Sequence, residues 1–133
     1  IDYSTNTYVN PYEYELRKKF LWDNFEVKDN CAYVLVNYAQ LQNMDGTLSD
    51  VGGYSSSLIA IDNMHYSFSL VEYEIGKFSL SIRSKIGYSA IDTATELGGG
   101  GHLYAAGAKF ECKDMDTACK KVLRLLKKDE KQN

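Results

Sequence analysis

The sequence predicts a single α/β domain, in which helices flank a mixed central β-sheet and a glycine-rich loop follows a short helix. The chain has 133 residues, of which 44% are hydrophobic and 25% are charged, as in a soluble domain with its own core. Strand-like apolar runs alternate with segments of helical period. A hairpin pattern over residues 65–84 adds an antiparallel pair. Together these features predict the α/β class.

The first 30 residues are expected to form a linker and an N-terminal helix. Residues 1–10 are polar and show no period, as in a connector. Pro11 suits the first position of a helix, and Leu16, Phe20 and Phe25 then recur at roughly helical spacing.

Two elements and a turn are predicted before the hairpin. Residues 31–38 (CAYVLVNY) are almost continuously apolar, which favours a central strand. Residues 43–46 have turn chemistry. Ser49 is a predicted N-cap for a helix that packs Leu58 and Ile61 against the core.

The hairpin is predicted to turn at Gly76-Lys77, between strands 65–75 and 78–84. This turn would give the facing apolar pairs Ile75 with Phe78, Tyr73 with Leu80, and Val71 with Ile82. Ser79, Ser81 and Arg83 would then project from the opposite face. Arg83, at the end of a rigid strand, is a candidate anion contact; the alternative is a weak cross-strand ion pair with Glu72.

Three further elements follow the hairpin. Ser89 and Asp92 have the spacing of a capping box for a helix that ends at Gly98. Residues 105–112 are predicted to return to the sheet as a strand, and Asp114 to cap the last helix. The buried stripe of that helix is expected to be Ala118, Val122, Leu125 and Leu126.

Four consecutive glycines, Gly98–Gly101, precede His102, and this run is the most unusual part of the chain. Ordering a glycine costs roughly 0.5–1 kcal/mol more than ordering an alanine, so a repeated run indicates a need for bare backbone. Unprotected N–H groups can bind phosphate oxygens, and an imidazole can add a donor or a charge. The alternative is an ordinary helix end followed by a surface loop.

Composition excludes several classes of function. A net charge of −3 argues against a general duplex-DNA binder, and no apolar run is long enough to cross a membrane. Cys31, Cys112 and Cys119 have neither zinc spacing nor a paired framework, which favours reduced thiols in the cytoplasm. The chain begins at Ile1, so we expect it to be part of a longer protein.

The order Ser81-Ile82-Arg83-Ser84, a short capped helix, Gly-Gly-Gly-Gly-His and Ala-Ala-Gly resembles the C-terminal domain associated with DHH phosphoesterases. That family includes oligoribonucleases that also act on nucleoside 3′,5′-bisphosphates, cyclic-dinucleotide phosphodiesterases and single-strand DNA exonucleases. The resemblance covers residues 31–128 and is most specific over residues 81–107.

The resemblance implies a substrate-binding lobe of a hydrolase whose other lobe holds two divalent metal ions, usually manganese. Residues 1–30 would then lead from the missing metal lobe, and residues 31–133 would form the substrate-binding domain. The substrate contacts carried over are Arg83, Ser84, Gly99, Gly100, Gly101 and His102. The chain has no Asp-His-His triplet and only two histidines, so we expect no catalytic or metal-binding residue in it.

Several alternatives stay open. The module could bind nucleotide or RNA without catalysis, or resemble the glycine-rich domain that ends alanyl-tRNA synthetases, although His102 stands where that domain typically has Arg-Pro. The candidate ligands are short RNA or DNA oligonucleotides, a bisphosphate nucleotide and a cyclic dinucleotide, with no membrane contact. A homodimer is left open, and Tyr104 is a weak candidate for stacking on a base.

Overall fold

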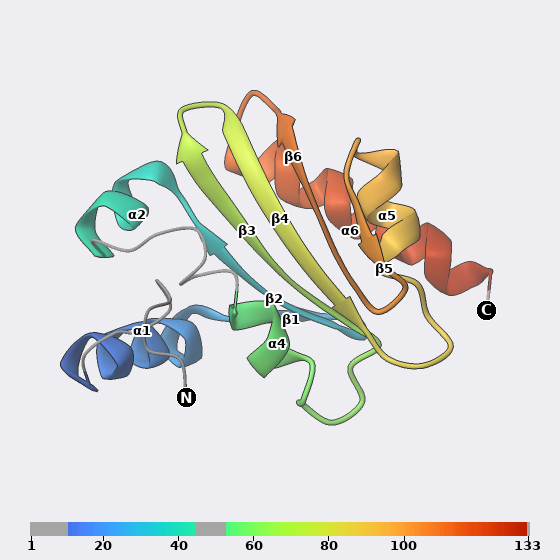
Figure 1. Cartoon of the computed structure of the whole chain (residues 1–133), viewed down its shortest axis with the longest axis horizontal. Coiled ribbons are helices and arrows are strands. Elements are labelled where there is room, and N and C mark those ends of the chain that lie inside the picture. Colours follow the sequence, from blue (N-terminus) through green and yellow to red (C-terminus); the bar gives the residue numbers. More distant parts are fainter. Residues whose placement is uncertain (1–10, 45–52, 133) are drawn as a thin grey trace.

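The computed structural model describes residues 11–44 and 53–132, which form one α/β unit (Figure 1). The predicted connector 1–10, the turn at 45–46 and the cap at Ser49 lie outside the described residues. Within the described ranges the elements in chain order are α1 (Pro11–Asn24), β1 (Glu26–Lys28), β2 (Cys31–Val36), α2 (Tyr38–Met44), α4 (Tyr54–Leu58), β3 (Tyr66–Glu74), β4 (Lys77–Ser84), α5 (Ile91–Glu96), β5 (Gly100–His102), β6 (Ala105–Glu111) and α6 (Met115–Lys131).

The strands form one six-stranded sheet in the order β1-β2-β3-β4-β6-β5 (Figure 1). Strands β2 and β3 are parallel, and the other neighbouring pairs are antiparallel. The predicted mixed sheet with flanking helices is therefore confirmed. The parallel pair needs a crossover, which α2 and α4 provide between β2 and β3.

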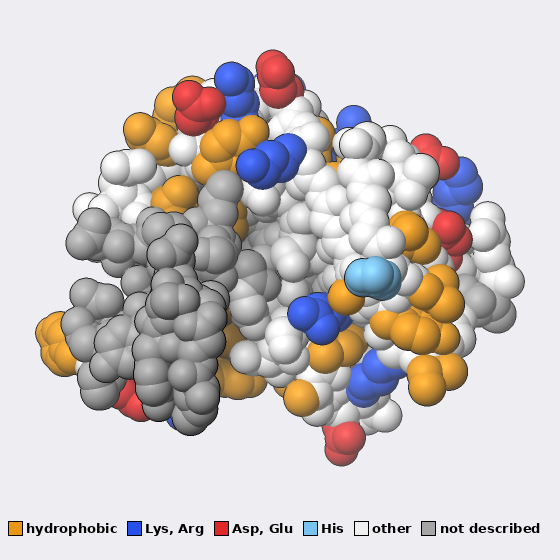
Figure 2. All heavy atoms as spheres, in the orientation of Figure 1, with side chains coloured by type: hydrophobic (Ala, Val, Ile, Leu, Met, Phe, Trp, Pro, Cys, Tyr) orange, Lys and Arg blue, Asp and Glu red, His pale blue; other side chains and the backbone are white. Residues whose placement is uncertain are grey.

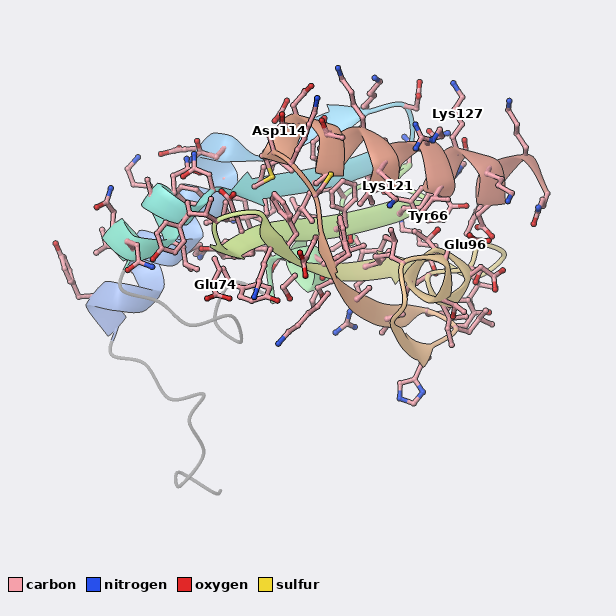
Figure 3. All side chains as sticks on the ribbon, turned by 90° about the horizontal axis from the view of Figure 1, so that it is seen from above. Tyr66, Glu74, Glu96, Asp114, Lys121 and Lys127 are labelled. Atoms are coloured by element: carbon pink, nitrogen blue, oxygen red, sulfur yellow. The ribbon has the colours of Figure 1, made fainter. Side chains whose placement is uncertain are left out.

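The two faces of the sheet are covered differently. One, which we call the helix face, packs against α5 and α6 and holds the larger core, including Phe68, Phe78, Leu80 and Ile82. Figure 3 shows α6 lying along this face, with Lys121 and Lys127 on the helix. The other, which we call the serine face, carries Ser67, Ser69, Ser79 and Ser81. A smaller core with residues of α1, α2 and α4 covers its β2–β3 side.

Helix α6 begins as predicted. Asp114 is its N-cap and accepts a hydrogen bond from the Thr117 N–H at 2.8 Å. Ala118, Val122 and Leu126 are buried in the larger core and Leu125 is partly buried. None of the described helices is both long and apolar enough to span a bilayer.

The predicted pairing of the hairpin is wrong. Glu74 pairs with Lys77, so the turn lies at Ile75-Gly76. The register of the two strands shifts just before this turn, between Glu72 and Glu74. Gly76 adopts φ 79°, a conformation that glycine reaches easily. Leu70 faces Leu80 and Phe68 faces Ile82 on the helix face, in place of the predicted partners Tyr73 and Val71.

Two other boundaries differ from the sequence prediction. Strand β2 ends at Val36, because Asn37 and Gln40 cap the start of α2 through reciprocal side-chain bonds of 2.9 and 2.8 Å. The short strand β1 was not predicted; it pairs antiparallel with β2. Most of the expected glycine loop is strand, since Gly100–His102 forms β5 at the edge of the sheet.

Candidate functional site

Arg83 and His102 lie in one row across the serine face. Arg83 pairs with Ala105 between β4 and β6, and Ala105 pairs with His102 between β6 and β5. Paired residues of antiparallel strands share a face, so both side chains rise from the same side with Ala105 between them. Neighbouring strands are about 4.8 Å apart, which puts the two Cα atoms about 10 Å apart. We call this pair the Arg83–His102 clamp.

The next row of the same face has almost no side chains. Ser81, Gly107 and Gly100 pair in series across β4, β6 and β5, and we call these three residues the floor. A Cβ atom added at Gly100 would meet no atom within 4 Å, so the space above this residue is open. The floor leaves the clamp accessible to a ligand.

Helix α4 borders the floor on the β3 side. Ser55 lies 3.1 Å from Ser81 between their Oγ atoms, and the Ser67 hydroxyl donates to the Ser55 carbonyl. Ser55, Ser67 and Ser69 are buried, which leaves the β4, β6 and β5 part of the face as its exposed portion.

The glycines of the run serve the fold as well as the surface. Gly98 ends α5 with φ 86°, and the Gly99 N–H donates to the Ala94 carbonyl at 2.8 Å. A Cβ at Gly99 would lie 2.1 Å from the Gly107 carbonyl oxygen, and one at Gly101 would lie 2.7 Å from the Ala106 Cα. Close packing of this segment on β6 therefore requires glycine at 99 and 101, whereas Gly100 faces open space.

Ser84 does not join Arg83 on the serine face. It is buried, and its hydroxyl donates to the Tyr88 carbonyl at 3.0 Å and lies 3.4 Å from the Leu103 carbonyl. The Ser84 N–H donates to the Tyr104 carbonyl at 3.1 Å. Ser84 thus ties the β5–β6 turn, next to His102, to the end of β4, next to Arg83. Its hydroxyl points away from the clamp.

Arg83 and His102 are exposed, and neither side chain has an ion-pair or hydrogen-bond partner among the described residues. The alternative partner for Arg83, Glu72, accepts hydrogen bonds from the Tyr38 and Gly76 N–H groups at 3.1 Å each. Figure 2 shows a histidine beside a basic side chain on this side, next to a region of polar and backbone atoms. Within the part of the chain that the structure describes, the clamp therefore presents an unpaired guanidinium next to an imidazole, which suits an anion.

Other reactive chemistry is sparse in the part of the chain that the structure describes. No three His, Cys, Asp or Glu side chains there are grouped to hold a metal ion. All three cysteines are free, and burial raises the pKa of Cys119 to about 11 and that of Cys31 further. Both buried thiols stay protonated at neutral pH, which makes them poor nucleophiles. The other histidine, His65, is paired with Glu130 at 2.6 Å.

A family model described as the DHHA1 domain matches residues 32–128. The chain belongs to the DHHA1 domain family. This membership confirms the resemblance noted from the motifs around Arg83 and His102. The matched range begins at the second residue of β2, includes β3 to β6 and ends inside α6.

The chain is similar to parts of two longer proteins. A bifunctional oligoribonuclease and PAP phosphatase NrnA from Thermus thermophilus is 46% identical over 50 residues, which are 38% of this chain and 15% of that protein. An exopolyphosphatase-related protein from Bacteroides fragilis is 25% identical with a TM-score of 0.79, over 92% of this chain and 36% of that one. This chain therefore covers well under two thirds of the length of either protein.

Two more distant structures share the fold. A pGpG-specific phosphodiesterase, PggH, from Vibrio cholerae has a TM-score of 0.59 at 14% identity, over 89% of this chain and 40% of that one. The C-Ala domain of Aquifex aeolicus alanyl-tRNA synthetase has a TM-score of 0.55 at 14% identity, over 77% of this chain and 96% of that domain. At this identity the likeness shows the architecture alone.

The sequence indicated Arg83 and the glycine–histidine segment but not how they combine. The floor residues Ser81 and Gly107 were not identified as part of a site, because their role depends on which strands are neighbours. The Ala105-Ala106-Gly107 run was the available signal, since small residues permit close backbone approach.

Proposed function

We propose that this chain is the substrate-binding lobe of a metal-dependent phosphoesterase and that its serine face binds a phosphorylated nucleotide or short oligonucleotide. The observation that carries the proposal is the row Arg83–Ala105–His102 beside the floor, in which neither of the two long side chains has a partner among the residues that the structure describes. A guanidinium binds phosphate through two parallel hydrogen bonds, and an imidazole on the other side adds a third contact. Membership of the DHHA1 family supports the same role.

We assign a role to each residue of the candidate site. Arg83 and His102 contact the phosphate, and Gly100 and Gly101 let the ligand approach the backbone of the edge strand. Gly99 and Ser84 contribute by position: Gly99 packs β5 onto β6, and Ser84 fixes the β5–β6 turn. The clamp orients the substrate, and orientation of the reacting group is itself a large part of catalysis.

Hydrolysis is proposed only for a protein that carries both lobes. The described residues do not fit a two-metal centre, because they hold no cluster of three ligating side chains. We place the Mn²⁺ or other divalent ions in a preceding lobe, and we take residues 1–30 as the connection to it and 31–133 as the binding domain. The names of the relatives, an oligoribonuclease and phosphatase and a pGpG phosphodiesterase, support hydrolysis of phosphate esters.

The proposed substrates are short RNA or DNA oligonucleotides, a bisphosphate nucleotide or a cyclic dinucleotide. Reduced cysteines favour a cytoplasmic protein. The alternative, a nucleotide- or RNA-binding module without catalysis, shares the same face and differs in having no metal lobe. The fold likeness to C-Ala is the observation that keeps this alternative open.

An NMR titration of this chain tests the proposal. A 5′-phosphorylated RNA dinucleotide and a cyclic dinucleotide are added to the unaltered chain and to Arg83→Ala, His102→Ala and Arg124→Ala. Arg124 is an exposed arginine on α6, so its variant controls for loss of charge. We expect shifts at Arg83 and Gly100–His102 that disappear in the first two variants and persist in the third.

Two results would overturn the proposal. The first is that the unaltered chain shows no shifts with any of these ligands at millimolar concentration. The second is that Arg124→Ala weakens binding as much as Arg83→Ala, which would mean that net charge, and not the clamp, attracts the ligand.

A further inference from the structure

The serine face continues beyond the floor to a second cation. Lys109 pairs with Ser79 between β6 and β4, one row past Ser81 and Gly107. Its side chain therefore rises on the same side as Arg83 and His102. Lys109 is the fourth residue after Ala105 on β6, which corresponds to about 13 Å along the strand.

Lys109 is exposed and held over the face. Its Nζ atom lies 5.3 Å from the centre of the Tyr73 ring, and Tyr73 is partly buried against the smaller core. Among the described residues Lys109 has no carboxylate partner. A cation resting on an aromatic ring stays desolvated on one side only, so it can still bind an anion from solvent.

No bulky side chain lies between the clamp and Lys109 on β4, β6 and β5. The intervening positions of this face are Ser79, Ser81, Gly107 and Gly100. Figure 2 shows polar and backbone atoms, without acidic side chains, beside the histidine and its neighbouring basic group. A stacked strand rises about 3.4 Å per nucleotide, so the distance of about 13 Å from Ala105 to Lys109 corresponds to about four nucleotide steps.

We propose that Lys109 contacts a second phosphate and that the face therefore prefers a 5′-phosphorylated oligonucleotide of about four or more nucleotides to a mononucleotide. This inference rests on the proposed function, because the first phosphate is the one bound by the Arg83–His102 clamp. Lys109 adds nothing to a ligand with one phosphate held at the clamp. Lys109 contributes to affinity only when the ligand is long enough to reach from the clamp to Lys109.

Affinity as a function of ligand length tests this. Isothermal titration compares a nucleoside 5′-monophosphate with 5′-phosphorylated tetra- and pentanucleotides, using the unaltered chain, Lys109→Gln, Lys109→Arg and Lys121→Gln. Lys121 is a matched control: its Nζ lies 5.9 Å from the Phe110 ring, but it belongs to α6 on the helix face (Figure 3).

We expect Lys109→Gln to weaken the longer ligands by roughly two- to fivefold, the range of an exposed ion pair, and to leave the mononucleotide unchanged. Lys109→Arg should restore the affinity, and Lys121→Gln should bind every ligand as the unaltered chain does. An equal loss for all ligand lengths, an equal loss in Lys121→Gln, or no loss in Lys109→Gln would each overturn the inference.

The same titration separates this inference from the proposed function. If Arg83→Ala abolishes binding while Lys109→Gln changes nothing, the clamp stands and only the second contact fails. If the unaltered chain binds none of the ligands, or if Arg83→Ala binds as well as the unaltered chain, the proposed function fails and this inference fails with it.

Discussion

Gly99 and Gly100 are neighbours in the chain, yet a methyl group added at each would meet different surroundings. At Gly99 it would lie 2.1 Å from the Gly107 carbonyl oxygen and 2.6 Å from the Ala108 Cα, both backbone atoms that cannot rotate away. At Gly100 it would meet nothing within 4 Å, and Gly100 has no positive φ that an alanine would strain to adopt. One glycine serves packing and the other serves the open surface.

The two alanine variants should therefore separate stability from binding. We expect Gly99→Ala to lower the free energy of unfolding by about 1–3 kcal/mol, the usual cost of overpacking, as measured by thermal or urea denaturation. Gly100→Ala should melt close to the unaltered chain but weaken the dinucleotide in calorimetry, because its methyl group stands on the floor. A Gly100→Ala protein that binds normally, or a Gly99→Ala protein of unchanged stability, would contradict this account.

At the scale of elements, strand β3 shows where sequence reasoning stopped. Its first half alternates, with Phe68 and Leu70 on the helix face and Ser67 and Ser69 on the serine face. After Leu70 the apolar residues Val71 and Tyr73 lie on the serine face, so alternation near the turn does not show which side meets the larger core. Strand β4 alternates between Ser79, Ser81 and Arg83 on one side and Phe78, Leu80 and Ile82 on the other. The sequence therefore predicted correctly which side chains of β4 are buried, and that Arg83 lies on the opposite face.

The pairing of strands limited the prediction of the site in the same way. The helix end at Gly98 and the return strand β6 follow from local signals that the sequence carries. The row that joins Arg83 to His102 depends on β6 lying between β4 and β5, and that order is a property of the whole sheet. Local sequence patterns indicated Arg83 and the glycine–histidine segment as candidates. Only the order of the strands shows that Arg83 and His102 lie in one row.

The N-cap of helix α6, Asp114, leads to a prediction about how the stability of the fold depends on pH. The Thr117 N–H, through its hydrogen bond to the Asp114 carboxylate, lowers the pKa of Asp114 below its ordinary value of 3.8. A lowered pKa means that the ionised cap stabilises the fold above pH 3.8 and that this contribution is lost as the pH falls through the folded-state pKa. Asp114→Ala should therefore melt below the unaltered chain at pH 7, and the gap should narrow in more acidic solution.

Circular dichroism melting curves at pH 7, 5 and 3 measure this gap. Asp114→Asn is the matched variant, because asparagine caps helices well but does not ionise. It should retain most of the stability at pH 7 and lack the acid-dependent part. A gap between Asp114→Ala and the unaltered chain that stays constant from pH 7 to pH 3 would show that the carboxylate charge is irrelevant to the cap.

At the scale of the whole molecule, binding and hydrolysis are expected to depend on different parts. The described residues carry the Arg83–His102 clamp but no cluster of metal-ligating side chains. This chain spans 15% of one relative by aligned residues and 36% of another, so such proteins have ample room for a second lobe. Ligand binding by this chain should then be insensitive to metal ions.

Chelation provides the test of that division. Calorimetric affinity of this chain for a 5′-phosphorylated dinucleotide should be the same in EDTA and in Mn²⁺, because the proposed phosphate contacts, Arg83 and His102, require no metal ion. A protein carrying both lobes should lose hydrolysis of the same dinucleotide in EDTA and regain it with Mn²⁺. In that protein Arg83→Ala should raise KM with metal present, since the clamp holds the substrate in place. Loss of binding to this chain in EDTA, or hydrolysis by this chain alone in Mn²⁺, would place the metal site within it.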